Sequence, residues 1–276
     1  MSMVVNTNVL SLITQTNLTN SQNKLNTSVE QLSSGLRINS AMDDPAGLAI
    51  ATGMQAQVNG MNQGIINANA AISLAQTADG AMGAVTNMLQ QMRTLAVEAA
   101  NGTNAGQGDQ DLNAEYQQLA SQITMTLKNT QFNGIAIFSQ ASAMTYQIGA
   151  NATDQIAVTG MTLASAKALS AASLGNLNSG TFATAAIGNV DSALGVVNSA
   201  RATNGANEIR FQQVVQSMQV NSQNTAAAES QLMDTDYAQA TSNLTQAEII
   251  QQAGVAMLSQ ANSIPQNVLS LLAKLP

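Results

Sequence analysis

The stretch VNGMNQGIINANAAISLAQTADGAMGAVTNMLQQMRTLA, residues 58–96, decides the fold. Its apolar residues recur at spacings of three, four or seven, and they are Val58, Met61, Ile65, Ala68, Ile72, Ala75, Met82, Val85, Leu89, Met92 and Ala96. This period is that of one face of an α-helix. A helix over about 46–100 would be roughly 80 Å long at 1.5 Å per residue, so it cannot fold back into a small globule.

Signals for the ends of this helix lie on both sides of it. Asp44 can cap the first turn, and Pro45 suits the first helical position, where no backbone N–H is needed. The glycine-containing run 101–108 predicts the end of the helix. A further helix is expected over about 111–129, where apolar residues again share one face.

The middle of the chain changes its period. Phe132-Asn133-Gly134 predicts a turn, and residues 135–160 mix β-branched and aromatic residues with glycine, which is typical of short hairpins. Residues 161–185 are rich in Ala, Ser, Gly and Asn and are expected to form weak helix and loop. Helical periodicity returns from Val190.

Both ends of the chain are amphipathic. Leu18, Leu25 and Leu32 recur at a spacing of seven, and Val29 and Leu36 are assigned to the same stripe. A last helix is expected over about 236–272, and Pro265 is expected to kink it or to begin a new turn. Its stripe comprises Ile250, Ala253, Met257, Ile264, Val268 and Leu271.

These patterns predict a mainly α fold: a long antiparallel coiled-coil or helical-bundle rod formed by the N- and C-terminal segments, with a small β-hairpin region in the middle. Residues 1–42 and 235–276 are expected to form an inner terminal-helix domain. Residues 43–234 form a helical rod domain with a β-hairpin insert around 135–185. The terminal helices have little to pack on in a single chain, so we expect them to be disordered alone and to fold on assembly.

Composition excludes most enzyme chemistry. The chain has no His and no Cys, so a His-based zinc site, a Ser–His–Asp triad and a disulfide framework are all impossible. We therefore expect no catalytic, cofactor-binding or metal-binding residues. Eight basic residues against 15 acidic ones make nucleic acid an unsuitable partner. The uncharged stretch 249–273 carries too many amides for membrane insertion.

Two groups of charged residues stand out, and for one of them, the arginines, two interpretations stay open. Asp43-Asp44 and Asp234-Thr235-Asp236 are interpreted as helix-capping regions rather than metal sites. Four arginines stand out in a chain with 8% charged residues: Arg37, Arg93, Arg201 and Arg210. Each is either a specific ion-pair or interface anchor or part of a solvated face.

Several motifs resemble one family. LSSGLRINSAMDDPAGLAIA (32–51) closely resembles the N-terminal signature of bacterial flagellins. The further N-terminal motifs are VVNTNVLSL (4–12), LAVEAANGT (95–103) and TQFNG (130–134). At the other end the matching motifs are DTDYA (234–238), QQAGVAMLSQAN (251–262) and PQNVLSLL (265–272). The resemblance covers about 1–135 and 200–272, and the short middle implies little or no outer variable domain.

The resemblance implies a secreted structural subunit that polymerises with its own copies into the extracellular flagellar filament used for swimming. It implies export by the flagellar type III apparatus, and an export chaperone, a cap and junction proteins as partners. The polymerisation interface is expected on the terminal helices, at Leu18, Leu25, Leu32, Leu36, Ile250, Met257, Ile264, Val268 and Leu271. The alternative is a hook–filament junction protein, which shares the terminal helices.

The same resemblance implies a surface sensed by a host Toll-like receptor. Its expected residues are Leu89, Gln90, Gln91, Arg93, Leu95 and Glu115. Gln91 stands where the family usually has Arg, so we expect weaker sensing. A metallopeptidase insert, known in some family members, is excluded because it needs two His ligands.

Overall fold

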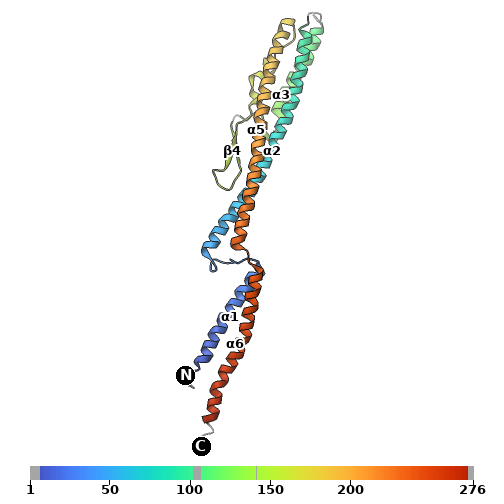
Figure 1. Ribbon diagram of the computed structural model, residues 1–276. Helices are drawn as coiled ribbons and strands as arrows, with labels where there is room; N and C mark the ends of the chain where they lie inside the picture. Colours follow the sequence, from blue (N-terminus) through green and yellow to red (C-terminus); the bar gives the residue numbers. More distant parts are fainter. Residues whose placement is uncertain (1–6, 102–106, 141, 273–276) are drawn as a thin grey trace. The chain divides into compact units, whose positions relative to one another are not determined.

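Helices dominate the computed structural model, which describes residues 7–101, 107–140 and 142–272, the side chains of 266–272 excepted. The chain divides into two units, Met1–Gln55 with Thr225–Pro276, and Ala56–Asn224. Their boundaries fall inside helices α2 (Pro45–Ala99) and α5 (Gly180–Met233) rather than at the helix ends. In the first unit α1 (Val9–Ser34) and α6 (Tyr237–Leu272) lie side by side (Figure 1).

Helix α2 has the start and the period that its sequence predicts. The backbone N–H groups of Ala46 and Gly47 donate to Asp44 Oδ1 at 3.1 and 2.9 Å, which confirms Asp44 as the cap. An alternation of three and four residues relates most of its buried positions from the middle of the helix onward, with Leu74 and Thr86 buried beside them. The alternating positions are Ala68, Ala71, Ala75, Ala78, Met82, Val85, Leu89, Met92, Ala96 and Ala99.

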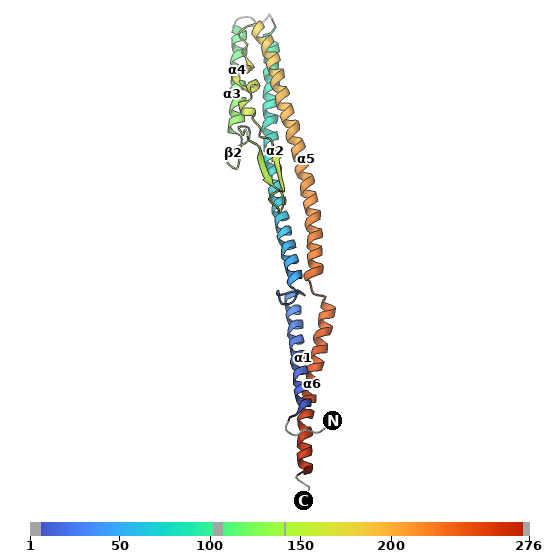
Figure 2. The ribbon, with the colours of Figure 1, turned by 90° about the vertical axis from the view of Figure 1, so that its left-hand side faces the viewer.

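The main core of the second unit lies between α2, α3 (Gln107–Asn129) and α5 (Figure 2). Short helical turns close it: η2 (Leu163–Ser165), η3 (Lys167–Leu169) and α4 (Ala171–Leu174). Tyr116 of α3 is fully buried, and its hydroxyl donates to the Leu174 carbonyl at 2.7 Å. Burial raises the pKa of Tyr116 to about 12.

The β region consists of two antiparallel hairpins. β1 (Gln131–Phe132) pairs with β2 (Ile135–Ala136) across Asn133 and Gly134, whose φ angles of 50° and 78° suit an Asn-Gly hairpin turn. β3 (Met144–Gln147) pairs with β4 (Gln155–Val158). The predicted mainly α fold with a small hairpin region is confirmed.

The β3–β4 hairpin builds a second, smaller core. Ile156 and Val158 pack there with Ala68 and Ala71 of α2 and with two residues of α5, Phe211 and Met218. The Tyr146 and Phe211 rings meet edge to face with centroids 5.2 Å apart. This core holds the hairpin on both long helices.

Some element boundaries differ from the prediction. The strands occupy 131–158, and α5 begins at Gly180 rather than near Val190. The first buried residues of α5 are Ala183 and Ala186, whose small side chains give a weak periodic signal. Helix α6 continues through Pro265.

Candidate functional site

Helices α1 and α6 meet along a line of mostly small side chains, here called the α1–α6 seam. The seam comprises the buried and partly buried residues Ser11, Thr14, Leu18, Ser21, Leu25, Ser28 and Leu32 of α1, and Ala240, Leu244, Ala247, Gln251, Gly254, Leu258 and Ala261 of α6. Both sets follow the three-four alternation of a coiled coil. Because small residues recur between the leucines, the two backbones approach closely; a Cβ at Gly254 would lie 3.3 Å from Leu18 Cδ1.

Side-chain hydrogen bonds join the two helices across the seam. Ser21 Oγ donates to the Ala247 carbonyl at 3.1 Å, and Asn8 Nδ2 donates to the Ala261 carbonyl at 2.8 Å. Ser11 Oγ donates to Asn262 Oδ1 at 2.9 Å. The pairing of α1 with α6 therefore depends on satisfied polar groups as much as on apolar burial.

The predicted interface leucines of α1 lie in this seam. Leu18, Leu25 and Leu32 are partly buried against α6 of the same chain. Leu36 follows the helix and forms an isolated antiparallel bridge with Asp234. Val29 is 50% exposed, so its assignment to the same stripe was wrong.

The predicted stripe of α6 is displaced from the seam. Ile250, Met257 and Ile264 are 46%, 56% and 38% exposed, and each precedes a partly buried position by one residue. One residue corresponds to a rotation of roughly 100° about the helix. The large apolar residues of this stripe therefore stay uncovered in the single chain. The side chains of Val268 and Leu271 lie outside the described residues.

We give the name outer apolar face to eight of the large exposed apolar residues of the two terminal helices. It comprises Leu10, Leu12, Ile13 and Val29 of α1, and Ile249, Ile250, Val255 and Met257 of α6, each 46–60% exposed. Exposed apolar residues gathered on one helix pair indicate a protein contact surface. Ile250 and Met257 are among the residues predicted from the sequence for the polymerisation interface, whereas Leu12, Ile13 and Ile249 are not, because adjacent apolar residues do not fit a single helical stripe.

A turn after α1 is fixed by backbone and arginine contacts. Arg37 N donates to the Met233 carbonyl, and its Nη2 donates to the Leu232 carbonyl, both at 2.6 Å. Thr235 N donates to the Gly35 carbonyl at 2.9 Å. Arg37 therefore anchors the end of one helix against another segment of the same unit.

The acidic residues of this region hold turns and helix starts through hydrogen bonds to nearby groups. Backbone hydrogen bonds, first from Ser40 and then from Asn39, hold the pKa of Asp43 below its usual value. Asp236 accepts from the N–H groups of Ala238 and Gln239 at 2.9 and 3.2 Å, as the capping interpretation predicts. Among the described residues, no group of His, Cys, Asp or Glu side chains is arranged to hold a metal ion.

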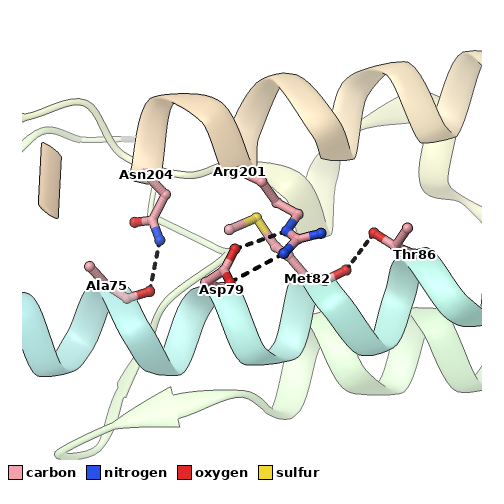
Figure 3. A network of polar contacts seen from close by, with 6 residues as sticks. All are labelled: Ala75, Asp79, Met82, Thr86, Arg201 and Asn204. Carbon is pink, nitrogen blue, oxygen red and sulfur yellow. Dashed lines mark hydrogen bonds and ion pairs between the residues drawn. The ribbon is translucent and has the colours of Figure 1, made fainter. Parts of the chain in front are cut away.

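A polar network joins α2 to α5 in the second unit (Figure 3). Arg201 donates to both carboxylate oxygens of Asp79, at 2.8 and 3.2 Å, and this hydrogen bonding lowers the pKa of Asp79. Arg93 forms a second ion pair with Asp191 at 2.7 Å. These two arginines are thus ion-pair anchors, whereas Arg210 forms no ion pair with any described residue.

The residues expected to face a receptor do not all lie on the surface. Leu89 is fully buried in the main core, so its side chain is not part of an exposed surface, and Leu95 is partly buried. Gln90, Gln91 and Glu115 are exposed. The Arg93 side chain is 48% exposed but engaged with Asp191. Leu89 falls on the three-four repeat of buried positions in α2, so its side chain lies in the core and not on the surface expected to face a receptor.

Comparison with known proteins decides the family. The N-terminal helical region of bacterial flagellin matches residues 5–143, and the C-terminal helical region matches residues 187–272. A flagellin of Halalkalibacterium halodurans is 38% identical over 273 residues, covering 98% of this chain and 100% of that protein. The chain belongs to the bacterial flagellin family.

Other similar proteins show which length class this flagellin belongs to. The flagellar filament 33 kDa core protein of Treponema phagedenis is 34% identical, over 98% of this chain and 100% of its own. A flagellin of Salmonella muenchen is 49% identical over 151 residues, but the match spans only 30% of that protein. This flagellin is thus a short form without a large variable domain.

Solved structures agree with the fold. The crystal structure of Bacillus cereus flagellin matches with a TM-score of 0.51 at 30% identity, over 59% of this chain and 94% of that one. A putative flagellar hook-associated protein from Vibrio parahaemolyticus matches with a TM-score of 0.60 at 12% identity, over 70% and 100%, which shows a shared fold alone.

Membership of the family gives the flagellin a structural role. It is a self-assembling subunit of the extracellular flagellar filament and not an enzyme. None of its described helices is both long and apolar enough to cross a membrane.

Proposed function

We propose that residues 1–42 and 235–276 form the inner domain of the filament, with residues 43–234 as the helical domain outside it. The outer apolar face is the contact between neighbouring subunits. The observation that carries this proposal is the exposure of eight large apolar residues on α1 and α6 while the seam between them is already filled. Each such side chain contributes about 1.5–3 kcal/mol when it is fully buried.

Growth of a helical filament requires a contact that does not close on itself. Two different surfaces of one subunit then meet repeatedly and generate an open polymer. The terminal helices supply such surfaces because α1 and α6 carry different apolar residues toward the outside. In a free subunit these residues have no partner and the helix pair is held by the α1–α6 seam alone, so we expect the pair to become fully ordered only when a subunit joins the growing end.

Seeded polymerisation tests the proposal. Purified subunits of the native chain, of Ile250→Ser with Met257→Ser, and of the matched control Gln252→Ser are added to short filament seeds. Pelleting and negative-stain electron microscopy then measure extension. The double variant should raise the concentration needed for growth at least about tenfold, because two apolar side chains are lost from the contact. The control replaces an exposed amide on the same helix and should grow like the native chain.

Equal growth of the double variant and the control would overturn the assignment of the contact to the outer apolar face. A native chain that caps seeds without extending them would instead indicate the alternative, a hook–filament junction protein. The same assay therefore separates the two functions.

Export is proposed to follow the flagellar type III route, in an unfolded state, with an export chaperone, a cap and junction proteins as partners. The chain has no Cys, so no disulfide has to be broken before threading. Detection of the subunit in the medium of a strain with an intact flagellar export apparatus, and not of a strain lacking it, tests this route.

Recognition by a host Toll-like receptor is proposed through the exposed residues Gln90, Gln91, Arg93 and Glu115, without the buried Leu89. Gln91 offers no charge, whereas an arginine there could donate charge-assisted hydrogen bonds. Gln91→Arg should therefore increase the receptor response of a reporter cell. An equal response from the variant and the native chain would contradict the role of this position.

A further inference from the structure

The pattern of buried residues where α2 packs against α5 repeats every seven residues. The buried positions of α5 include Val190, Val197, Asn204, Phe211 and Met218, which are spaced by seven, and most of those of α2 follow a three-four alternation. A shift of one helix by seven residues restores an apolar pattern of the same kind. Apolar contacts alone therefore discriminate poorly between registers of such a pair.

One of these buried positions of α5 is polar. Asn204 is 4% exposed, and its Nδ2 donates to the Ala75 carbonyl of α2 at 2.7 Å. Arg201 lies one turn of α5 before Asn204 and donates to both carboxylate oxygens of Asp79, which lies one turn of α2 after Ala75 (Figure 3). We propose that Asn204 and the Arg201–Asp79 pair together set the register of α2 against α5.

Neither shifted register reproduces both contacts. A slide of one heptad in one direction would bring Arg201 to Thr86 and Asn204 to Met82. The Met82 side chain is fully buried, and Thr86 offers Arg201 no carboxylate. The opposite slide would bring Arg201 to Ile72, which offers no carboxylate.

Two further polar contacts, both toward the C-terminal end of α5 from this cluster, are made in the observed register. Ser222 Oγ donates to Asn62 Oδ1 at 3.2 Å, and Gln76 Nε2 donates to Glu208 Oε1 at 3.1 Å. Both are exposed, so they add little energy by themselves. The buried Asn204 amide has the larger effect, because a buried polar group without a partner is costly.

The inference can be tested on the full-length monomer, because the chain has no native Cys and engineered thiols are unique. The cysteine pair Asn62→Cys with Ser222→Cys reports the observed register. The pairs Asn62→Cys with Val215→Cys, and Gln76→Cys with Val215→Cys, report a slide of one heptad in either direction. Each pair is treated with a short bifunctional thiol reagent, and far-ultraviolet circular dichroism checks that the helices are intact.

The three pairs are compared in the native background and in Asn204→Val, Asp79→Asn and their combination. Thr86→Val is the matched control, because it removes a buried hydroxyl whose bond stays within α2. We expect cross-linking of a shifted pair to rise about tenfold in Asn204→Val, less in the exposed Asp79→Asn, and most in the combination. Asp79→Asn keeps the test valid if Asn204→Val fails to fold.

Cross-linking confined to the observed pair in every variant would overturn the proposal. An equal rise in Thr86→Val would also overturn it, because general loosening of the core would then explain the result. Since the assay uses monomers, its outcome is independent of the filament contact proposed above.

Discussion

Gly60 and Gly64 show how a missing side chain positions a whole hairpin. A Cβ at Gly64 would overlap the Ile148 carbonyl, and one at Gly60 would overlap Ala150. Next to them, Asn67 Nδ2 donates to the Gln147 carbonyl at 2.8 Å. The β3–β4 hairpin therefore lies directly on the backbone of α2, although glycine is a poor helix former.

Gly64→Ala is expected to destabilise the monomer by about 1–3 kcal/mol, because the hairpin must move away from α2. The control Gly80→Ala has no atom within 4 Å of the new Cβ and should be neutral or stabilising, by up to about 1 kcal/mol. Urea unfolding of both variants measures the difference. Similar free energies of unfolding for the two would contradict the close contact.

The Arg201–Asp79 pair makes stability depend on pH at the acid end. Hydrogen bonding to Arg201 lowers the pKa of Asp79 in the folded chain from the usual value of 3.8. At acid pH the Asp79 carboxylate therefore takes up a proton more readily in the unfolded chain than in the folded one. The contribution of the ion pair to the unfolding free energy is complete above the usual pKa and is lost as pH falls through the lower folded pKa.

Asp79→Asn should therefore have a flatter profile of unfolding free energy against pH below about 4 than the native chain. Urea unfolding at a series of pH values measures both profiles. High salt should reduce the difference between the two profiles, because both side chains of the ion pair are partly exposed and the salt screens their charges. Parallel profiles at low salt would show that the pair does not contribute.

At the scale of elements, Tyr116 ties α3 to α4. Tyr116→Phe keeps the buried ring but removes the bond to the Leu174 carbonyl, which should cost about 1–2 kcal/mol. The pKa of Tyr116 is raised to about 12, so its contribution is complete below the unfolded value of roughly 10 and is lost as pH rises through the folded value. Unfolding of the variant at pH 7 and at alkaline pH measures both effects. Equal stability of the two proteins at pH 7 would contradict the role of this bond.

The elements also show how far sequence periodicity reaches. The stripe of α2 was predicted because its core face carries large side chains such as Met82 and Leu89, which are fully buried. In α6 the same reasoning selected Ile250 and Met257, which are exposed, whereas the seam uses Ala247. Periodicity identifies an apolar stripe but does not say whether its partner belongs to the same chain. A coiled coil that uses small residues inside leaves the larger ones outside.

Contacts between distant segments were beyond prediction. Arg201 and Asp79 are 122 positions apart, and nothing in the local sequence pairs them. The capping role of Asp44 was predictable because its partners are its immediate neighbours. The helical period already placed Leu89 on the core face of α2. The resemblance to other flagellins implied instead that Leu89 faces a receptor, and the burial of its side chain contradicts this.

At the scale of the whole molecule, the scarcity of charge governs how assembly responds to salt. Only 8% of residues are charged, and the eight residues of the outer apolar face have just two charged sequence neighbours, the exposed Glu30 and Glu248. Sulfate should therefore lower the concentration needed for seeded growth, because it strengthens apolar burial, whereas sodium chloride of equal ionic strength should change it much less. Light scattering during growth measures both series. Equal effects of the two salts would indicate a charge-driven contact instead.

The hydrogen bonds of the α1–α6 seam have a consequence for how the chain tolerates change. Two acceptors on α6 are the main-chain carbonyls of Ala247 and Ala261, which every amino acid provides. Exchanging either alanine for another small residue leaves the acceptor in place, whereas replacing Ser21 or Asn8 removes the donor outright. At Ala247 and Ala261, α6 thus requires only small size, whereas the paired positions of α1 require particular side chains. The Ser11–Asn262 and Gln22–Gln251 pairs differ from these, because each needs a particular side chain on both helices.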